Sequence, residues 1–238
     1  IYDGLVGSEM CIRDSNLTNE DVNNAIVADN KRNAVIKNGT SLPNNLAGGS
    51  TTQIPVIINY NDNSIEEVTE TIRTKVNKDE LIASRNHLND EISKENKTPS
   101  SIQNFDQAIE RARTQIENAK NEADRVINKE FATPEEVNHA LSKVREAQNQ
   151  IDEAQRLLQN KVDNSELVAA KERLESALEP PASTEGMTES SKQEYNTKRQ
   201  NAEHVIQDAT TVINNGDASV QNVRDAKNRV EQALREYN

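Results

Sequence analysis

The sequence has few of the residues that a single large hydrophobic core would need. It contains one cysteine, no tryptophan and only 3% aromatic residues among 238 positions. One cysteine cannot form an intramolecular disulfide, and so few aromatic side chains argue against a single large core. Hydrophobic residues make up 33% of the chain, which is enough for small helical bundles built on Ala, Val, Ile and Leu.

Long apolar runs and net positive charge are also missing. No run reaches the roughly 18 residues that a membrane-spanning helix needs, and neither a signal peptide nor a C-terminal anchoring signal is recognisable. If the parent protein is exported, we therefore expect this chain to be an internal piece of it. A net charge of −12 disfavours nucleic acid and anionic membrane surfaces as partners, because both need a basic footprint.

The same phrases occur twice in the chain at a fixed distance. Glu80–Ala83 returns as Glu166–Ala169, a displacement of 86 residues, and Val126–Asn128 returns as Val212–Asn214 at the same displacement. A fixed period indicates tandem copies of one structural unit, an arrangement typical of stalks and binding arrays.

Both copies show the 3-4 apolar spacing of amphipathic helices. Thr98-Pro99 and Thr133-Pro134 each supply an N-cap followed by proline at the first helical position, and Glu136 can complete a capping box. We predict a three-helix bundle in each copy, over 77–162 and 163–238. The expected seams are Leu81, Leu88 and Ile92; Ile102, Phe105, Ile109, Ala112, Ile116, Ala119, Ala123 and Val126; Val137, Ala140, Val144, Ala147, Ile151, Ala154 and Leu158; Leu167, Ala170, Leu174, Ala177 and Leu178; Tyr195, Ala202, Val205, Ala209 and Val212; and Val220, Val223, Val230, Leu234 and Tyr237.

Two interpretations of the junction between the copies stay open. No Pro or Gly occurs between Pro134 and Pro180, which favours one continuous or mildly kinked helix over 134–178. The seams on either side differ in heptad register, so such a helix would turn its buried face by about 200°. The alternative is a break at Asp163, which could form a capping box with Glu166.

Residues 16–76 read as a separate helix-plus-hairpin segment. Thr18 is a candidate N-cap, followed by a modest apolar face of Val22, Ala25, Ile26 and Val35. A loop rich in Gly, Ser, Thr and Asn over 38–53 comes next.

A β-hairpin is expected after that loop. Ile54–Tyr60 is rich in β-forming residues, Asn61–Ser64 has turn chemistry, and 65–76 alternates apolar with polar residues. Pro55 favours an edge or strand-start position. Two strands alone are marginally stable, so partner strands are expected upstream of this piece.

Residues 1–15 differ from the rest of the chain. They hold Cys11, one of two Met and two of seven Gly, and they look like a translated sequencing-adapter read. The alternative is an ordinary disordered terminus. The fold class expected from the whole is mainly α: tandem three-helix bundles forming an elongated rod, preceded by a small α+β segment with a β-hairpin.

Several phrases of the second copy together resemble the FIVAR module. The first copy departs from the module, because Phe105 replaces its Tyr and Asn128–Phe131 replaces its Asn-Asn-Gly turn. The phrases of the second copy that match are Leu167–Leu174, Tyr195, Val212–Gly216, Ala218-Ser219 and Val223–Leu234.

The range 16–238 is similar to the family of giant staphylococcal surface proteins that bind extracellular matrix (the Ebh/Embp type). Ile54–Tyr60 and Glu66–Ile72 are its most specific phrases. The resemblance implies a monomeric, very long helical rod on the bacterial surface that engages host matrix such as fibronectin and contributes to envelope integrity. Glycan binding is a further property that the resemblance implies for the module.

Residues that could carry chemistry are scattered. His87, His139 and His204 lie on different expected helices without a second ligand at metal-binding spacing. Each therefore reads as a solvated helix-face residue rather than a metal ligand or a catalytic base.

Acidic pairs and glycines do not suggest a catalytic site either. Glu66-Glu67 and Glu135-Glu136 read as solvated faces, since no apolar pocket is evident that would raise a carboxyl pKa. Gly48-Gly49 follows no strand and opens no helix, unlike a phosphate loop. We therefore expect no catalytic, cofactor-binding or metal-binding residues and assign none to a ligand.

The aromatic residues leave alternatives. Tyr195 and Phe105 occupy seam positions and read as core residues, with a ligand platform as the alternative. Phe131 lies in a turn and either covers the end of a bundle or meets a partner.

Three functions remain. The first is an adhesin stalk that binds matrix weakly per module and multivalently. The second is a carbohydrate-binding module for cell-wall or host glycans, which requires clustered exposed aromatics. The third is a purely mechanical spacer with additive unit stability. An enzyme is least favoured, because slender bundles do not readily form a pocket.

Overall fold

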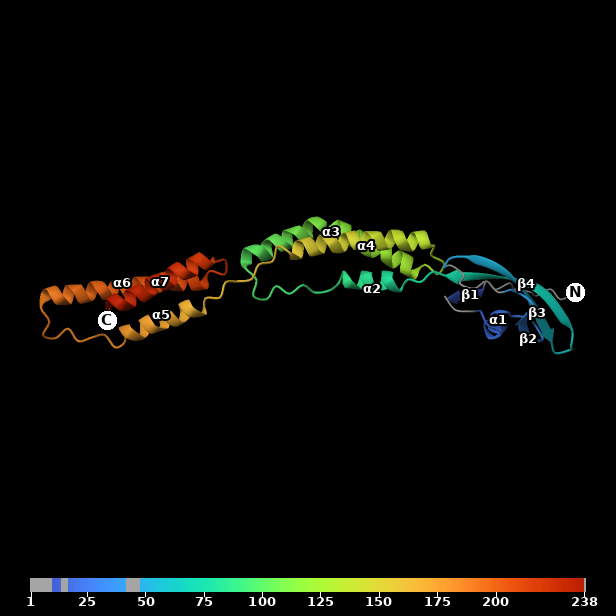
Figure 1. The fold of residues 1–238 in the computed structure, drawn as a ribbon, viewed down its shortest axis with the longest axis horizontal. Coiled ribbons are helices and arrows are strands. Elements are labelled where there is room, and N and C mark those ends of the chain that lie inside the picture. The colour runs from blue at the N-terminus through green and yellow to red at the C-terminus, as the bar shows by residue number, and fades with distance from the viewer. Residues whose placement is uncertain (1–9, 14–16, 42–47, 238) are drawn as a thin grey trace. The chain divides into compact units, whose positions relative to one another are not determined.

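The computed structural model describes residues 10–13, 17–41 and 48–237 (Figure 1). It divides into two compact units. Unit 1 comprises residues up to 91 together with 111–151, and unit 2 comprises 92–110 together with 152–238, so that the division falls inside two helices. Within the described ranges, no helix is long and apolar enough to cross a membrane. In chain order the elements are β1 (Met10–Arg13), α1 (Asn19–Ala25), β2 (Lys31–Ile36), β3 (Thr51–Tyr60), β4 (Ile65–Lys75), α2 (Asp79–His87), α3 (Pro99–Asn128), α4 (Pro134–Gln155), α5 (Ser165–Leu178), α6 (Glu189–Asn214) and α7 (Val220–Tyr237).

The four strands form one sheet in the order β1-β4-β3-β2, in which β1 is parallel to β4 and the other pairs are antiparallel. Helix α1 begins where the sequence predicted, because Thr18 and Asp21 form a capping box. The helix packs Val22 and Ile26 against the sheet. The other buried members of this core are Ala34, Ile54, Val56, Ile58 and Ile72.

The partner strand of the hairpin lies within the chain, so the expectation of partners upstream is corrected. Val35 belongs to β2 and not to the apolar face of a helix, since α1 ends at Ala25. The side-chain oxygens of Asn19 and Asn23 accept the backbone N–H groups of Ile36 and Ala34, each at 2.8 Å. Helix α1 therefore satisfies the outer edge of β2, which explains why so short a strand is stable there.

Pro55 lies in the interior of a strand that has neighbours on both sides, which corrects its predicted edge or strand-start position. Its carbonyl accepts the N–H of Lys37 at 3.0 Å, one residue beyond the end of β2. In an antiparallel pair the N and C=O of one residue point to the same side. The missing N–H of Pro55 thus falls where the β2 strand has already ended.

The predicted turn of the hairpin is confirmed. Asn63 has a φ of 65°, in the left-handed region that Asn tolerates. The Asp62 carboxylate accepts the backbone N–H of Ser64 at 3.0 Å and its hydroxyl at 2.6 Å.

Near the N-terminus, strand β1 places Met10–Arg13 beside β4, a pairing that the sequence did not indicate. The remaining positions of the 1–15 stretch lie outside the described residues.

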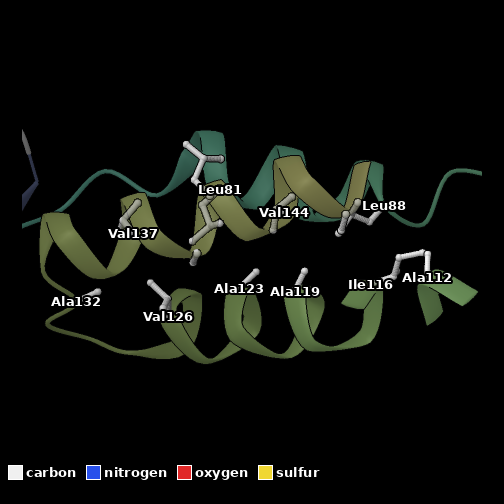
Figure 2. Packing of buried hydrophobic residues seen from close by; sticks show 13 residues of the cluster. Leu81, Leu88, Ala112, Ile116, Ala119, Ala123, Val126, Ala132, Val137 and Val144 are labelled. Carbon is white, nitrogen blue, oxygen red and sulfur yellow. The ribbon is translucent and has the colours of Figure 1, made fainter. Parts of the chain in front are cut away.

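Helices α2, α3 and α4 enclose one core in unit 1, in which the labelled side chains of the three helices point toward one another (Figure 2). Small residues line its centre: Ala123, Ala140 and Ala147 are fully buried, which lets the helix backbones approach closely. The predicted cap of α4 is confirmed, because Thr133 Oγ1 accepts the N–H of Glu136 at 3.1 Å and Glu136 accepts that of Thr133 at 3.0 Å.

Helices α5, α6 and α7 enclose a second, separate core in unit 2. Leu167, Leu174 and Val230 are fully buried in it. Val220, a predicted seam residue at the start of α7, is instead 58% exposed. The seam of α7 runs through Ala226, Val230 and Ala233, two of which the sequence analysis did not place there.

The favoured continuous helix over 134–178 is wrong. Helix α4 ends at Gln155 and α5 begins at Ser165. The segment between them pairs with the residues before α3: Thr98 N donates to Gln159 O at 2.8 Å, and Lys161 N donates to Asn96 O at 2.9 Å. The Gln159 carbonyl and the Lys161 N–H are used in these bonds and cannot also serve a continuous helix.

The alternative break is correct in place but not in detail. Asp163 Oδ1 accepts the N–H of Ser165 at 2.9 Å, two residues along, and the predicted capping box with Glu166 does not form. The equivalent residue of the first copy behaves in the same way, since Asn77 Oδ1 accepts the N–H of Asp79 at 2.8 Å. Both are short side-chain turns that start a helix.

A prediction concerns the independence of the second core. Leu174→Ala removes a fully buried side chain and should lower the free energy of unfolding of the α5–α7 bundle by about 2–5 kcal/mol. Urea denaturation followed by circular dichroism measures the loss, and hydrogen exchange should assign it to 165–237. The control Val220→Ala, at an exposed position, should change stability by less than about 0.5 kcal/mol. Equal loss of protection in α2 would contradict separate cores.

A second prediction concerns Glu70, a buried residue of β4. Burial raises the pKa of its carboxyl. At a pH between the ordinary and the raised pKa, the folded protein therefore binds more protons at this group than the unfolded chain does. Stability due to this group therefore falls as pH rises from the ordinary Glu pKa toward the raised value. Glu70→Gln should raise the unfolding temperature of the sheet at neutral pH, and the gain should vanish at about pH 4. The exposed Glu67→Gln serves as control; a pH-independent gain would refute the assignment.

Candidate ligand-binding surfaces

The three histidines lie apart on exposed helix faces, as expected from the sequence. His87 contacts Asp90, and His204 Nδ1 lies 3.6 Å from Asp208. His139 is exposed on α4. Among the described residues, no group of three His, Cys, Asp or Glu side chains is arranged to hold a metal ion.

The acidic pairs serve structural bonds. Glu66 accepts the Tyr60 hydroxyl at 2.6 Å, which raises the pKa of Tyr60 to about 12. Glu67 pairs with Lys37 at 2.6 Å. Glu136 pairs with Lys129 at 2.7 Å, and the bonds from Lys129 and from the Thr133 backbone lower its pKa. Glu66, Glu67 and Glu136 are thus each engaged by a partner side chain.

The aromatic residues occupy three different environments. Phe105 is buried, and the Lys94 ammonium lies 5.2 Å from its ring centroid. Phe131 is half-buried beneath the Arg73 guanidinium, whose carbon lies 4.7 Å from the ring centroid. Phe131 therefore faces the basic end of β4, where Lys75 Nζ also lies 5.9 Å from the ring centroid.

Tyr195 and Tyr237 form an aromatic pair in the second bundle, with ring centroids 6.1 Å apart. The Tyr195 hydroxyl accepts the backbone N–H of Ala182 at 3.0 Å. A hydrogen bond between the two hydroxyls, 3.3 Å apart, lowers the pKa of Tyr195 and raises that of Tyr237. The Arg199 guanidinium donates to Leu178 O at 2.9 Å. These bonds to Ala182 and Leu178 hold the loop between α5 and α6 against α6.

One groove runs between α3 and α4 in unit 1, with a volume of about 420 Å³. We call it the amide groove, because all but one of its lining residues carry hydrogen-bonding side chains, two of them amides. Its charged members are Arg111 and Lys143, with Glu146 beside them. The amide groove is lined by Arg111, Thr114, Gln115, Asn118, Ala119, Lys143 and Glu146.

A second hollow of about 510 Å³ lies in unit 2, beside the chain that leads into α3. Leu158 supplies an apolar wall, and Asn96 and Lys97 form its rim. The backbone of these two rim residues is fixed, since Asn96 accepts Lys161 N and Lys97 forms a bridge with Asn160. Ser93, Glu95 and Gln155 complete the lining.

Both hollows suit recognition by hydrogen bonds and charge. Amide and hydroxyl side chains can donate to and accept from an extended peptide or a sugar. The two hollows therefore offer open surfaces lined mainly by hydrogen-bonding side chains, the first on two helices and the second beside the chain that leads into α3.

Sequence analysis did not find the amide groove. Arg111 and Lys143 each precede a seam residue, Ala112 and Val144, so their helix positions could be read from the periodicity. Which side chains of α3 face which side chains of α4 depends on how the two helices pack. Only the tertiary structure supplies that pairing.

Comparisons with known proteins match the repeat. The FIVAR domain model matches residues 84–152 and again 170–238, at the 86-residue displacement of the sequence repeat. The chain is 52% identical over 224 residues to the "Extracellular matrix-binding protein EbhB" of Staphylococcus aureus strains N315 and Newman. The same identity holds for the "Extracellular matrix-binding protein ebh" of strain NCTC 8325.

These relatives are far longer than the chain. The matches cover 94% of the chain but 6%, 3% and 2% of the three relatives, respectively. A solved structure, described as "Characterization of extracellular matrix binding protein- (Embp)-mediated Staphylococcus epidermidis adherence to fibronectin", is 59% identical with a TM-score of 0.43. It covers 68% of this chain and 96% of that one. With its two matched repeats, the chain belongs to the FIVAR domain family.

Proposed function

We propose that the chain is a segment of a bacterial surface adhesin that binds host extracellular matrix without catalysis. Each module binds weakly, and tandem modules together bind more strongly. The observation that carries the proposal is the repetition of one small bundle, with a separate core in each copy. A repeated unit gives many identical surfaces, which is how weak sites gain avidity.

The names of the relatives support the choice of ligand. The long staphylococcal relatives are named as extracellular matrix-binding proteins, and fibronectin is the matrix protein named for the solved S. epidermidis structure. Fibronectin is therefore the ligand to test first. An extracellular location on the bacterial surface and a monomeric rod are parts of the same proposal.

The surface chemistry is compatible with this role. The amide groove offers paired hydrogen-bonding side chains and two cations, Arg111 and Lys143. A chain with a net charge of −12 needs such local cations to approach an acidic partner segment. We assign first contact with the matrix to this groove, because its side chains stand on two packed helices.

The first binding prediction uses biolayer interferometry with the whole chain and a tandem fusion of two copies. On densely immobilised fibronectin, the fusion should dissociate more slowly than the single chain, because its second contact becomes intramolecular. On sparse fibronectin the difference should shrink. No binding by either folded protein would favour the mechanical spacer, and a glycan array would then test the carbohydrate-binding alternative.

The second binding prediction tests the amide groove. The double variant Arg111→Ser with Lys143→Ser should weaken fibronectin binding at low salt and reduce its salt dependence, because two charged contacts are lost. The matched control is Lys198→Ser, an exposed cation on α6 that pairs with Glu194 at 3.5 Å. Equal affinities of the double variant and the control would place the binding surface elsewhere.

A further inference from the structure

One turn has different side-chain chemistry in the two copies. It is the turn between the second and third helix of each bundle. The first copy has Lys129-Glu130-Phe131 there, and the second has Asn215-Gly216-Asp217. The residues just before it match, since Ile127 corresponds to Ile213 at the repeat displacement. In both copies this turn contacts the segment that precedes the bundle. We call it the neighbour turn.

In the second copy the neighbour turn caps a helix of the first copy. The Asp217 carboxylate accepts the backbone N–H of Ser100 at 3.0 Å and its hydroxyl at 2.6 Å. Ser100 lies in the first turn of α3, where backbone N–H groups have no partner within the helix. A carboxylate is favourable at this positive end of the helix dipole, and the two bonds lower the pKa of Asp217.

Gly216 allows this approach. A Cβ at this position would lie 2.8 Å from Pro99 Cδ and 2.9 Å from Pro99 Cγ, closer than carbon atoms can pack. A proline ring at the helix start and a glycine in the turn thus fit each other. Any larger residue at 216 would separate Asp217 from Ser100.

In the first copy the neighbour turn meets the end of a strand. The Phe131 ring lies beneath the Arg73 guanidinium, 4.7 Å from the centroid, and Lys75 Nζ lies 5.9 Å from it. Glu130 pairs with Lys75 at 3.1 Å. The neighbour turn of the first copy thus contacts the basic end of β4 through an aromatic ring and a carboxylate.

Residues around the neighbour turn make equivalent contacts in the two copies. The copies therefore differ mainly in the residues of the turn itself. Lys78 donates to Ile127 O at 2.9 Å, and its counterpart Asn164 donates to Ile213 O at 3.3 Å. Lys75 corresponds to Lys161, whose Cε lies near Gly216. The two copies therefore hold the start of the turn in the same way but place different turn residues against different neighbouring segments.

We propose that the neighbour turn specifies which segment a FIVAR copy packs against on its N-terminal side. Gly-Asp recognises the proline-led start of the long helix of a preceding copy. Glu-Phe recognises a strand end that carries two cations. This specificity concerns the joint between modules and is independent of matrix binding.

The experiment measures distances within the joint by double electron–electron resonance on the whole chain. In a Cys11→Ser background, spin labels at Gln103→Cys and Gln207→Cys report the second-copy joint from exposed positions on α3 and α6. The unaltered turn should give a narrow distance distribution. Asp217→Ala, and the exchange Gly216→Glu with Asp217→Phe, should both lose it.

The controls separate the joint from the fold. Asp217→Asn keeps an acceptor oxygen and should retain much of the narrow distribution, and Asp225→Ala on α7, away from the turn, should retain all of it. Circular dichroism must show unchanged helix content. An unchanged distribution in the folded Asp217→Ala and exchanged proteins would overturn the proposal.

The reverse exchange tests specificity at the other joint. Glu130→Gly with Phe131→Asp, with labels at Thr69→Cys and Asn149→Cys on exposed positions of β4 and α4, should lose the narrow distribution of the sheet–bundle joint. A narrow distribution in this variant would show that either turn serves either neighbour, which contradicts recognition. Fibronectin binding measured on the same proteins distinguishes failure of this proposal from failure of the adhesin proposal.

Discussion

The scarcity of large apolar side chains is the constraint on which the rest of this protein depends. With 33% hydrophobic residues, a bundle must draw its stability from narrow seams in which helices approach closely. Fully buried Ala123, Ala140 and Ala147 make that approach possible in the first copy. Such seams close one small core per bundle and leave polar faces outside. Length is then gained by repeating the bundle and not by enlarging it.

Because the cores are small, hydrogen bonds at the ends of the helices matter more for the stability of each bundle. Backbone groups there need partners, and the chain takes some of them from residues far away in sequence. Asp217 serves Ser100 across 117 positions, and Gln159 serves the N–H of Thr98. A cap supplied by another module links the folding of one helix to the placement of the next bundle. The bond between Thr98 and Gln159, together with that between Lys161 and Asn96, excludes the continuous helix that the uninterrupted sequence suggested.

The surface follows from the same architecture. The two hollows described above are open, and each is lined mainly by amide, hydroxyl and charged side chains from two neighbouring segments. Chemistry of this kind favours recognition by several hydrogen bonds at once. A repeated module multiplies such a surface.

The sequence by itself determined what local chemistry controls: the 86-residue repeat, the helix seams, the caps at Thr18 and Thr133, and the Asn61–Ser64 turn. These follow from the period of apolar residues and from side chains that bond within three positions. Tertiary structure decided strand β2, the place of Pro55 in the sheet, the break after Gln155, and the amide groove. Each depends on contacts between segments distant in sequence, for which neighbouring residues carry no signal.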